Sequence, residues 1–187
     1  MLGLRFQAAL KLHRMKHLVE AQRRPKSFGV VRGFIVDFSD SLLLLHRLEE
    51  DTFQINGFTA VRLKDVNAVR FFDSSTEWQR RAVECLGLRP SKPAAIRLAS
   101  LHVLLTSAGQ AYPLISIEIE ARRPGVCFIG EVAQVSDTSL LLEELDYGGT
   151  WCGRRRIRLA DITLIAFGGG YLGALALTAP KRKNGKK

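Results

Sequence analysis

The chain has 187 residues, of which 47% are hydrophobic, and a net charge of +10 at pH 7, which suits one ordinary domain or two small ones with a buried core. It has no apolar run near the ~20 residues of a membrane-spanning helix and no secretory-signal layout at its N-terminus, and its three cysteines show no CxxC spacing. These features argue against a membrane-spanning protein, a disulfide framework and a zinc site, and they predict a cytoplasmic protein without metal or cofactor.

Positive charge gathers at the two ends of the chain. Residues 1–26 hold seven Lys or Arg and one acid, a net +6, and residues 1–16 are expected to form a basic helix. The tail KRKNGKK (181–187) holds five bases and no acid. The 154 residues between these ends therefore sum to −1. This distribution predicts a neutral body with two basic appendages rather than a basic groove.

The segment 17–72 carries the signals of a small β structure. VVRGFIVDF (30–38) is rich in β-branched and aromatic residues, as strands are. Ser39 and Asp40 then predict a turn, because their side chains bond back to the local backbone. The leucine run that follows predicts a second strand, apolar on both faces and hence covered on both. The later strands are expected to be interrupted by a short turn at Asp65.

The segment 73–111 is predicted to be a helical linker. SSTEWQRRAVECLG (74–87) opens with a capping-box pattern from Ser74 to Glu77 and ends at a glycine. A proline-containing stretch, RPSKP (89–93), follows. SLHVLLTSAG (100–109) then predicts a second helix with Ser100 as its N-cap.

The segment 112–174 repeats the first one in the same order. SDTSLLLEEL (136–145) matches SDSLLLLHRL (39–48), Gly130 falls on Gly33, and RLADI (158–162) falls on RLKDV (62–66). The match extends over about fifty residues, which chance does not explain. It predicts a duplicated unit of five short strands, followed by a basic disordered tail at 175–187.

A helix followed by five bent strands, occurring twice, is the order of an Sm-like fold. The predicted fold class is therefore mainly β (α+β), with two tandem small SH3-like or Sm-like barrels, an N-terminal helix and linking helices. The string from CFIGEVAQV (127–135) to GGGYLGAL (168–175) resembles a group of uncharacterised bacterial proteins. The resemblance implies a tandem of such barrels and supplies no activity.

The Sm resemblance does not extend to an RNA site. The wider Sm family binds uridine-rich RNA through an asparagine in its first motif, and Leu44 and Leu141 stand at that position here. RLKD and RLAD replace the Arg-Gly of the second motif. The resemblance therefore implies a fold without that binding site.

No catalytic, cofactor or metal residues are predicted. The four histidines lack metal or triad spacing. Asp65 and Asp161 are expected to cap their own turns, and Cys152 to pack beside Trp151. GGGY (168–171) lacks the Lys-Ser/Thr of a phosphate loop and is expected to let the chain leave the sheet.

Two function classes remain. The first is a non-catalytic binding or adaptor protein, and the missing catalytic patterns favour it. The second is an enzyme or enzyme accessory subunit whose site is not visible from the sequence. Basic ends favour nucleic acid or an anionic membrane as partner, and the neutral body favours protein, with self-association as a further option. The candidate anion or nucleic-acid contacts are bases of the two ends and of GRRRIR (153–158): Arg14, Lys16, Arg23, Arg24, Arg154, Arg155, Arg156, Arg158, Lys181, Arg182 and Lys183.

Overall fold

The computed structural model describes residues 18–71 and 77–180. The helix predicted for residues 1–16, the capping box at Ser74 and the tail 181–187 lie wholly or partly outside these ranges. Ten strands and three α-helices make up the described chain.

The first half of the chain forms five strands. They are β1 (Leu18–Arg23), β2 (Val30–Phe38), β3 (Leu42–Glu49), β4 (Gln54–Arg62) and β5 (Val66–Phe71), with short 3-10 turns at Lys26–Phe28 and Leu63–Asp65. The second of these turns is the break expected at Asp65.

Two helices and the second set of strands follow. They are α2 (Glu77–Cys85), α3 (Leu101–Ala111), β6 (Ile115–Glu118), β7 (Cys127–Val135), β8 (Ser139–Leu145), β9 (Trp151–Arg158) and β10 (Leu164–Phe167), with a 3-10 turn at Leu159–Asp161 before β10. The helix α4 (Gly170–Thr178) comes last. Ser100 caps α3 as predicted, since its Oγ accepts a hydrogen bond from the backbone N–H of Val103 (3.2 Å).

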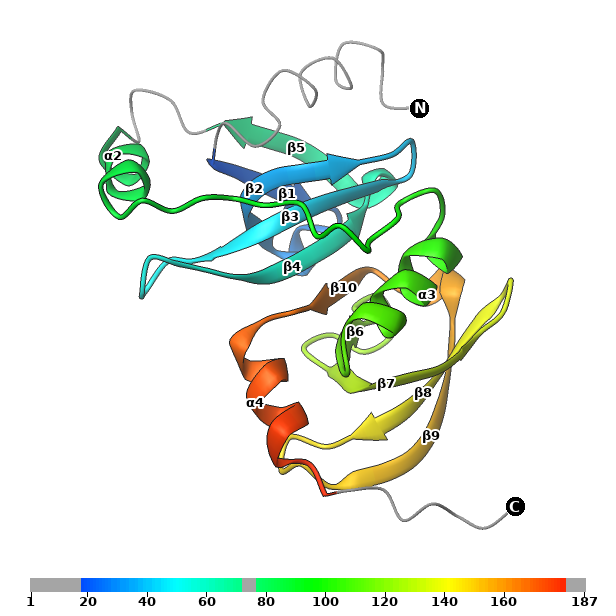
Figure 1. Cartoon of the computed structure of the whole chain (residues 1–187). Coiled ribbons are helices and arrows are strands. Elements are labelled where there is room, and N and C mark those ends of the chain that lie inside the picture. The colour runs from blue at the N-terminus through cyan, green and yellow to red at the C-terminus, as the bar shows by residue number, and fades with distance from the viewer. Residues whose placement is uncertain (1–17, 72–76, 181–187) are drawn as a thin grey trace.

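The strands form one continuous antiparallel sheet in the order β5-β1-β2-β3-β4-β10-β6-β7-β8-β9 (Figure 1). The predicted pair of barrels with several linking helices is therefore wrong. The physical reason is the edge of β4, whose backbone pairs with β10 from the other half, from Leu164 opposite Val61 to Phe167 opposite Phe58. This pairing continues the sheet across the middle of the molecule instead of closing each half on itself.

The sequence repeat is nevertheless visible in the strand order, because β5-β1-β2-β3-β4 and β10-β6-β7-β8-β9 are equivalent runs. Gly33 and Gly130 occupy equivalent places where two strands approach closely. A Cβ at Gly33 would lie 2.3 Å from the carbonyl oxygen of His46, and one at Gly130 would lie 2.0 Å from that of Glu143. The repeat thus preserves a glycine because no side chain fits there.

The two leucine runs lie on β3 and β8. β3 is more completely buried on its two faces than β8. Leu43 and Leu45 pack into the core of the first half, while Leu44 packs into a larger core that includes residues of α3 and of the second half. All three are fully buried. Leu140 and Leu142 are also fully buried, whereas Leu141 is only half-buried. As predicted, the outer face of the first run is covered, here by Ile96, Leu98 and α3.

Candidate functional site: a groove between the two halves of the sheet

A groove of about 580 Å³ lies where the two halves of the sheet meet. Its floor includes three small side chains that stand opposite one another on neighbouring strands: Thr59 of β4, Ala166 of β10 and Ser116 of β6. Side chains alternate between the two faces of a strand, so the larger neighbour Ile165 belongs to the core on the other face. Phe167 belongs to that core as well and also borders the groove. Small residues on one face of three paired strands leave the space that forms the groove.

The walls of the groove mix apolar and charged residues. The first half supplies strands β2 and β3, and the second half supplies β7 and the start of α4. The aliphatic lining residues are Val30, Val31, Leu48, Ile129, Leu164 and Leu172, and the aromatic ones are Phe58, Phe167 and Tyr171. The charged ones are Arg23, Arg32, Arg47, Glu49, Glu50, Asp51 and Glu118. Three arginines against four acids leave the lining with a net charge of −1.

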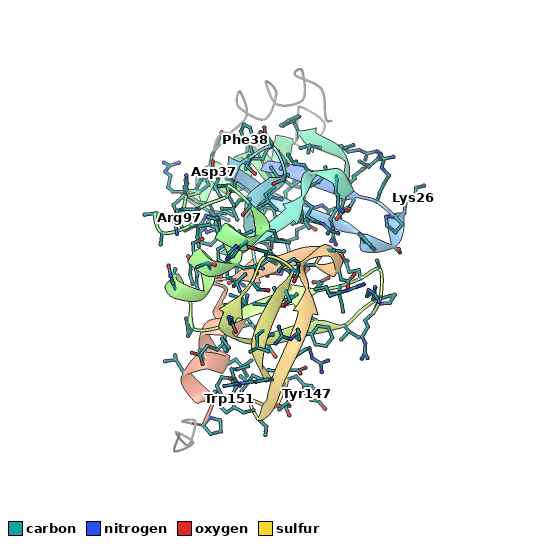
Figure 2. The ribbon with its side chains drawn as sticks, turned by 90° about the vertical axis from the view of Figure 1, so that its right-hand side faces the viewer. Lys26, Asp37, Phe38, Arg97, Tyr147 and Trp151 are labelled. Carbon is teal, nitrogen blue, oxygen red and sulfur yellow. The ribbon has the colours of Figure 1, made fainter. Side chains whose placement is uncertain are left out.

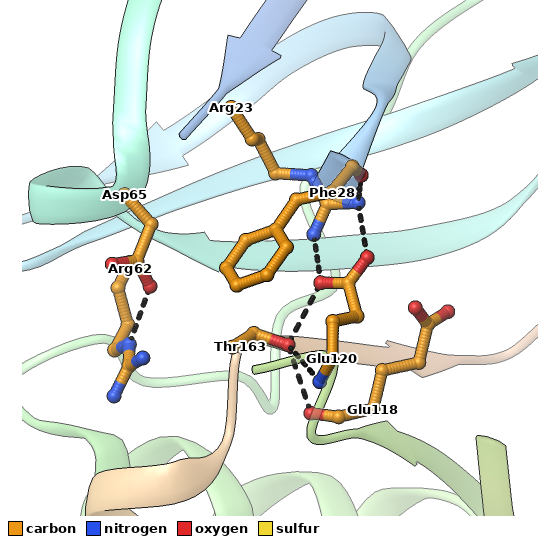
Figure 3. Close-up of polar contacts among 7 residues, drawn as sticks. All are labelled: Arg23, Phe28, Arg62, Asp65, Glu118, Glu120 and Thr163. Carbon is orange, nitrogen blue, oxygen red and sulfur yellow. Dashed lines mark hydrogen bonds and ion pairs between the residues drawn. The ribbon is translucent and has the colours of Figure 1, made fainter. Parts of the chain in front are cut away.

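One end of the groove is held by a buried ion pair between the two halves (Figure 3). Arg23, at the end of β1, donates to Glu120 through Nη1 (2.6 Å to Oε2) and Nη2 (2.9 Å to Oε1). The hydroxyl of Thr163 also donates to Glu120 (2.8 Å), and the second arginine nitrogen donates to the carbonyl of Phe28. The side chains of Arg23 and Glu120 are only 4% and 10% exposed. A two-point arginine–carboxylate pair of this kind fixes geometry as well as charge.

Glu118 stands two residues before Glu120 and lines the groove. Burial raises the pKa of the Glu118 carboxyl, and the nearby charge of Glu120 raises it further, against the opposing influence of Arg23 and Arg47. A titratable group with a perturbed pKa in a hollow is a common mark of a binding or reaction site. Glu118 is therefore a lining residue whose titration depends on the surroundings that the groove provides.

The other end of the groove is held by Asn56 of β4. Its side-chain oxygen accepts a hydrogen bond from the backbone N–H of Gly170 at the start of α4 (2.7 Å), and its side-chain nitrogen donates to Glu49 (3.3 Å). The neighbouring Gly57 has a φ of +69°, and a Cβ there would lie 2.5 Å from the backbone nitrogen of Gly169. The two halves therefore approach too closely at this point for any residue but glycine.

Among the basic candidates that the structure describes, Arg23 and Arg24 lie in different surroundings. Arg23 is buried in the ion pair with Glu120, so it takes no part in a basic surface. Arg24 is exposed and borders a separate hollow of about 520 Å³, which Arg62 and Lys64 also line. Five further candidates lie outside the described residues: Arg14, Lys16, Lys181, Arg182 and Lys183.

The arginines of β9 are engaged with acidic and polar neighbours. Arg154 binds Glu143 (2.7 Å) and Arg155 binds Glu144 (2.7 Å), in both cases from the neighbouring strand β8. Arg156 donates to the hydroxyl of Ser139 (3.1 Å). Arg155 also lies over the ring of Phe128, with its guanidinium carbon 4.4 Å from the ring centroid. Arg154 and Arg155 thus each have a carboxylate partner on β8, while Arg156 is exposed and bonds a neutral hydroxyl.

The aspartates that recur in the repeat form ion pairs rather than a paired acid site. Asp65 binds Arg62 (2.8 Å), and Asp161 binds both Arg158 (2.9 Å) and Arg122 (2.8 Å). Each aspartate thus ties its 3-10 turn to the arginine three residues earlier, which explains why the Arg-Leu-x-Asp string recurs.

Within the described residues, no group of three His, Cys, Asp or Glu is placed to hold a metal ion. Cys152 is exposed beside the half-buried Trp151, and GGGY leads into helix α4. Within α4, Leu172 is buried and Tyr171 is exposed.

One feature of the sequence, an alternation of apolar and polar residues, indicates part of the groove. YPLISIEIE (112–120) alternates, which places Ser116, Glu118 and Glu120 on one face of a strand. Arg23 is 97 residues from its partner Glu120, and Thr59 is joined to Ser116 through Ala166 of the intervening strand β10, so only the folded sheet shows that these residues meet.

Comparisons with family models, with curated proteins and with solved structures give no match to this chain. The resemblance to tandem-barrel bacterial proteins therefore stays an expectation. In the part of the chain that the structure describes, every helix is too short or too polar to cross a membrane.

Proposed function

We propose that this protein is a non-catalytic binding protein and that it holds a segment of a protein partner in the groove between its two halves. The proposal rests on the groove floor of Thr59, Ala166 and Ser116, three small side chains in register on three paired strands. The space above them is continuous with apolar walls and with charges of both signs. That mixture is typical of protein interfaces, where an apolar centre is surrounded by polar groups.

The charge of the body favours protein over nucleic acid as the partner. The segments outside the described residues carry +8 of the net +10, so the described residues sum to +2. The groove lining itself is slightly acidic, and the β9 arginines bind carboxylates or a hydroxyl. Nucleic-acid binding depends mainly on bases that are free to neutralise phosphates.

The test is to fill the groove without disturbing its frame. Ser116 is half-buried, and Ser116→Tyr would place a ring above the small floor residues. Ala95→Tyr is the matched control, because Ala95 is exposed in the segment before α3 and does not line the groove. Both variants and the parent chain are immobilised and exposed to a lysate of the source cells, with and without nuclease treatment, and captured proteins are quantified by mass spectrometry.

The proposal expects a protein that the parent chain and Ala95→Tyr capture equally and that Ser116→Tyr loses by at least tenfold. Urea unfolding of each variant confirms that the fold is retained. Capture of the same proteins by all three chains would remove the groove as the site. Capture that disappears on nuclease treatment would instead support nucleic acid as the partner.

A further inference from the structure

Glu118 of β6 stands in the groove among apolar and small neighbours. The strand register places Leu164 of β10 on one side of it and Cys127 of β7 on the other. Ser116, one of the floor residues, lies two positions earlier on the same face of β6. All four residues line the groove, and Glu118 is half-buried there. Its carboxyl group therefore belongs to a residue that borders the small floor and has an aliphatic side chain opposite it.

The arginines that line the groove form their ion pairs with carboxylates other than that of Glu118. These pairs are Arg23–Glu120, Arg32–Glu20, Arg32–Glu50 and Arg47–Glu49. Figure 3 shows Glu118 beside Glu120, whose two carboxylate oxygens accept hydrogen bonds from Arg23. Among the residues that the structure describes, Glu118 forms no ion pair. The described fold thus leaves this groove carboxylate without a cation in contact.

A half-buried carboxylate without a cation costs the fold stability. Burial and the neighbouring charge of Glu120 both raise the pKa of the Glu118 carboxyl, so the folded chain disfavours its charged form. Groups that depart in this way from the pairing rules of a stable fold are typical of functional sites. A carboxylate that is partly shielded from water also attracts a cation more strongly than an exposed carboxylate does. A ligand that brings a cation would therefore supply what the fold leaves out.

We propose that the protein segment held in the groove carries a lysine or an arginine whose cation pairs with Glu118. This inference rests on the proposed function, because it gives the chemistry of the segment that the groove holds. The small floor leaves room for the stem of a long basic side chain, which packs along apolar surface while its charge reaches a carboxylate. The lining charge of −1 is complementary to one added base. Figure 2 shows the two halves that the segment contacts, with Lys26 in the first half and Tyr147 and Trp151 in the second.

The test selects peptides that bind the groove and then changes the charge of Glu118. A library of random dodecapeptides displayed on phage is panned on the immobilised full chain, and clones that also bind Ser116→Tyr, in which the groove is filled, are discarded. We expect the remaining peptides to share a lysine or arginine at one position. In fluorescence anisotropy, Glu118→Gln should bind such a peptide about tenfold more weakly, because a charge-assisted hydrogen bond is lost. Panning on Glu118→Lys should instead select an aspartate or glutamate at that position.

The control is Glu131→Gln, which removes the same charge from an exposed position on β7 that does not line the groove. It should change the affinity for the peptide by less than about twofold, because an exposed charge is screened by salt. Equal losses with Glu131→Gln and Glu118→Gln, or groove-dependent peptides that share no base, would overturn this inference and leave the proposed function intact. Failure to recover any peptide that depends on the open groove would overturn both. Urea unfolding of each variant confirms that the fold is retained.

Discussion

Replacing Arg23 with methionine should be the most destabilising single change at the junction between the two halves. The substitution keeps an unbranched side chain of similar length but removes both hydrogen bonds to Glu120 (2.6 and 2.9 Å). The remaining carboxylate, only 10% exposed, would keep its bond from Thr163 but lose its cation. Removing one partner of a buried ion pair typically costs about 3–5 kcal/mol, because an uncompensated charge stays buried. We therefore expect a loss of that size in the free energy of unfolding at pH 7.

Urea unfolding followed by intrinsic fluorescence measures this loss, and a double-mutant cycle assigns it to the pair. Arg23→Met/Glu120→Gln should recover much of the stability that Arg23→Met loses, since the second change removes the stranded charge. The control is Arg47→Met, because the Arg47–Glu49 pair is exposed (50% and 34%) and should contribute less than about 1 kcal/mol. The reasoning fails if Arg23→Met costs no more than this control, or if the two changes at Arg23 and Glu120 are simply additive.

Three further predictions concern the repeat, the groove and the outer edge. Gly130→Ala should cost about 1–3 kcal/mol in urea unfolding, because its Cβ would lie 2.0 Å from the carbonyl oxygen of Glu143; an unchanged midpoint would contradict the close approach. Glu118→Gln should raise the urea midpoint at pH 7, since the raised pKa means that the folded protein disfavours the charged carboxyl. This advantage should vanish below the ordinary pKa of 4.5, where folded and unfolded states are both protonated; an advantage that persists there would show another cause. Replacing residues 154–156 by Phe-Thr-Ala, the residues of the equivalent β4 positions, should produce concentration-dependent association in sedimentation velocity, and a variant that stays monomeric would refute edge protection by these arginines.

The sequence predicts local structure well because the signals are local. The Ser39 turn is an example: its hydroxyl accepts a hydrogen bond from the backbone N–H of Leu42 (3.2 Å), as that of Ser136 does from Ser139 (3.1 Å). The same holds for the cap of α3 at Ser100 and for the 3-10 turn at Asp65. Each of these depends on residues within a few positions of one another.

The barrels were predicted wrongly because strand patterns do not say which free edge meets which. The pattern of apolar and polar residues in β4 is the same whether this strand closes a barrel or pairs with the other half of the chain. Only the folded structure shows that its neighbour is β10. Arg23 is misleading for the same reason. Arg24 and Lys26 follow it in the sequence and suggest a basic surface, but its partner Glu120 is 97 residues away, and the side chain of Arg23 is buried in the pair. The groove depends on these distant pairings, so sequence alone could not locate it.

The fourth strands of the two repeats, β4 and β9, differ in sequence and have different neighbours in the sheet. Phe58, Thr59 and Ala60 of β4 correspond to Arg154, Arg155 and Arg156 of β9. In β4 these positions pair with β10 inside the chain.

β9 stands at the end of the sheet, where the equivalent partner would be β5 of another copy of the chain. Such a pairing would place Arg155 opposite Arg70, the counterpart of Ala166, and like charges directly opposite each other destabilise a ladder. Charged side chains are also a common protection of edge strands. We therefore expect the arginines of β9, which the sequence predicts as anion or nucleic-acid contacts, to protect this edge of the sheet as well. The same strand position in β4, with its small threonine, provides the floor of the groove.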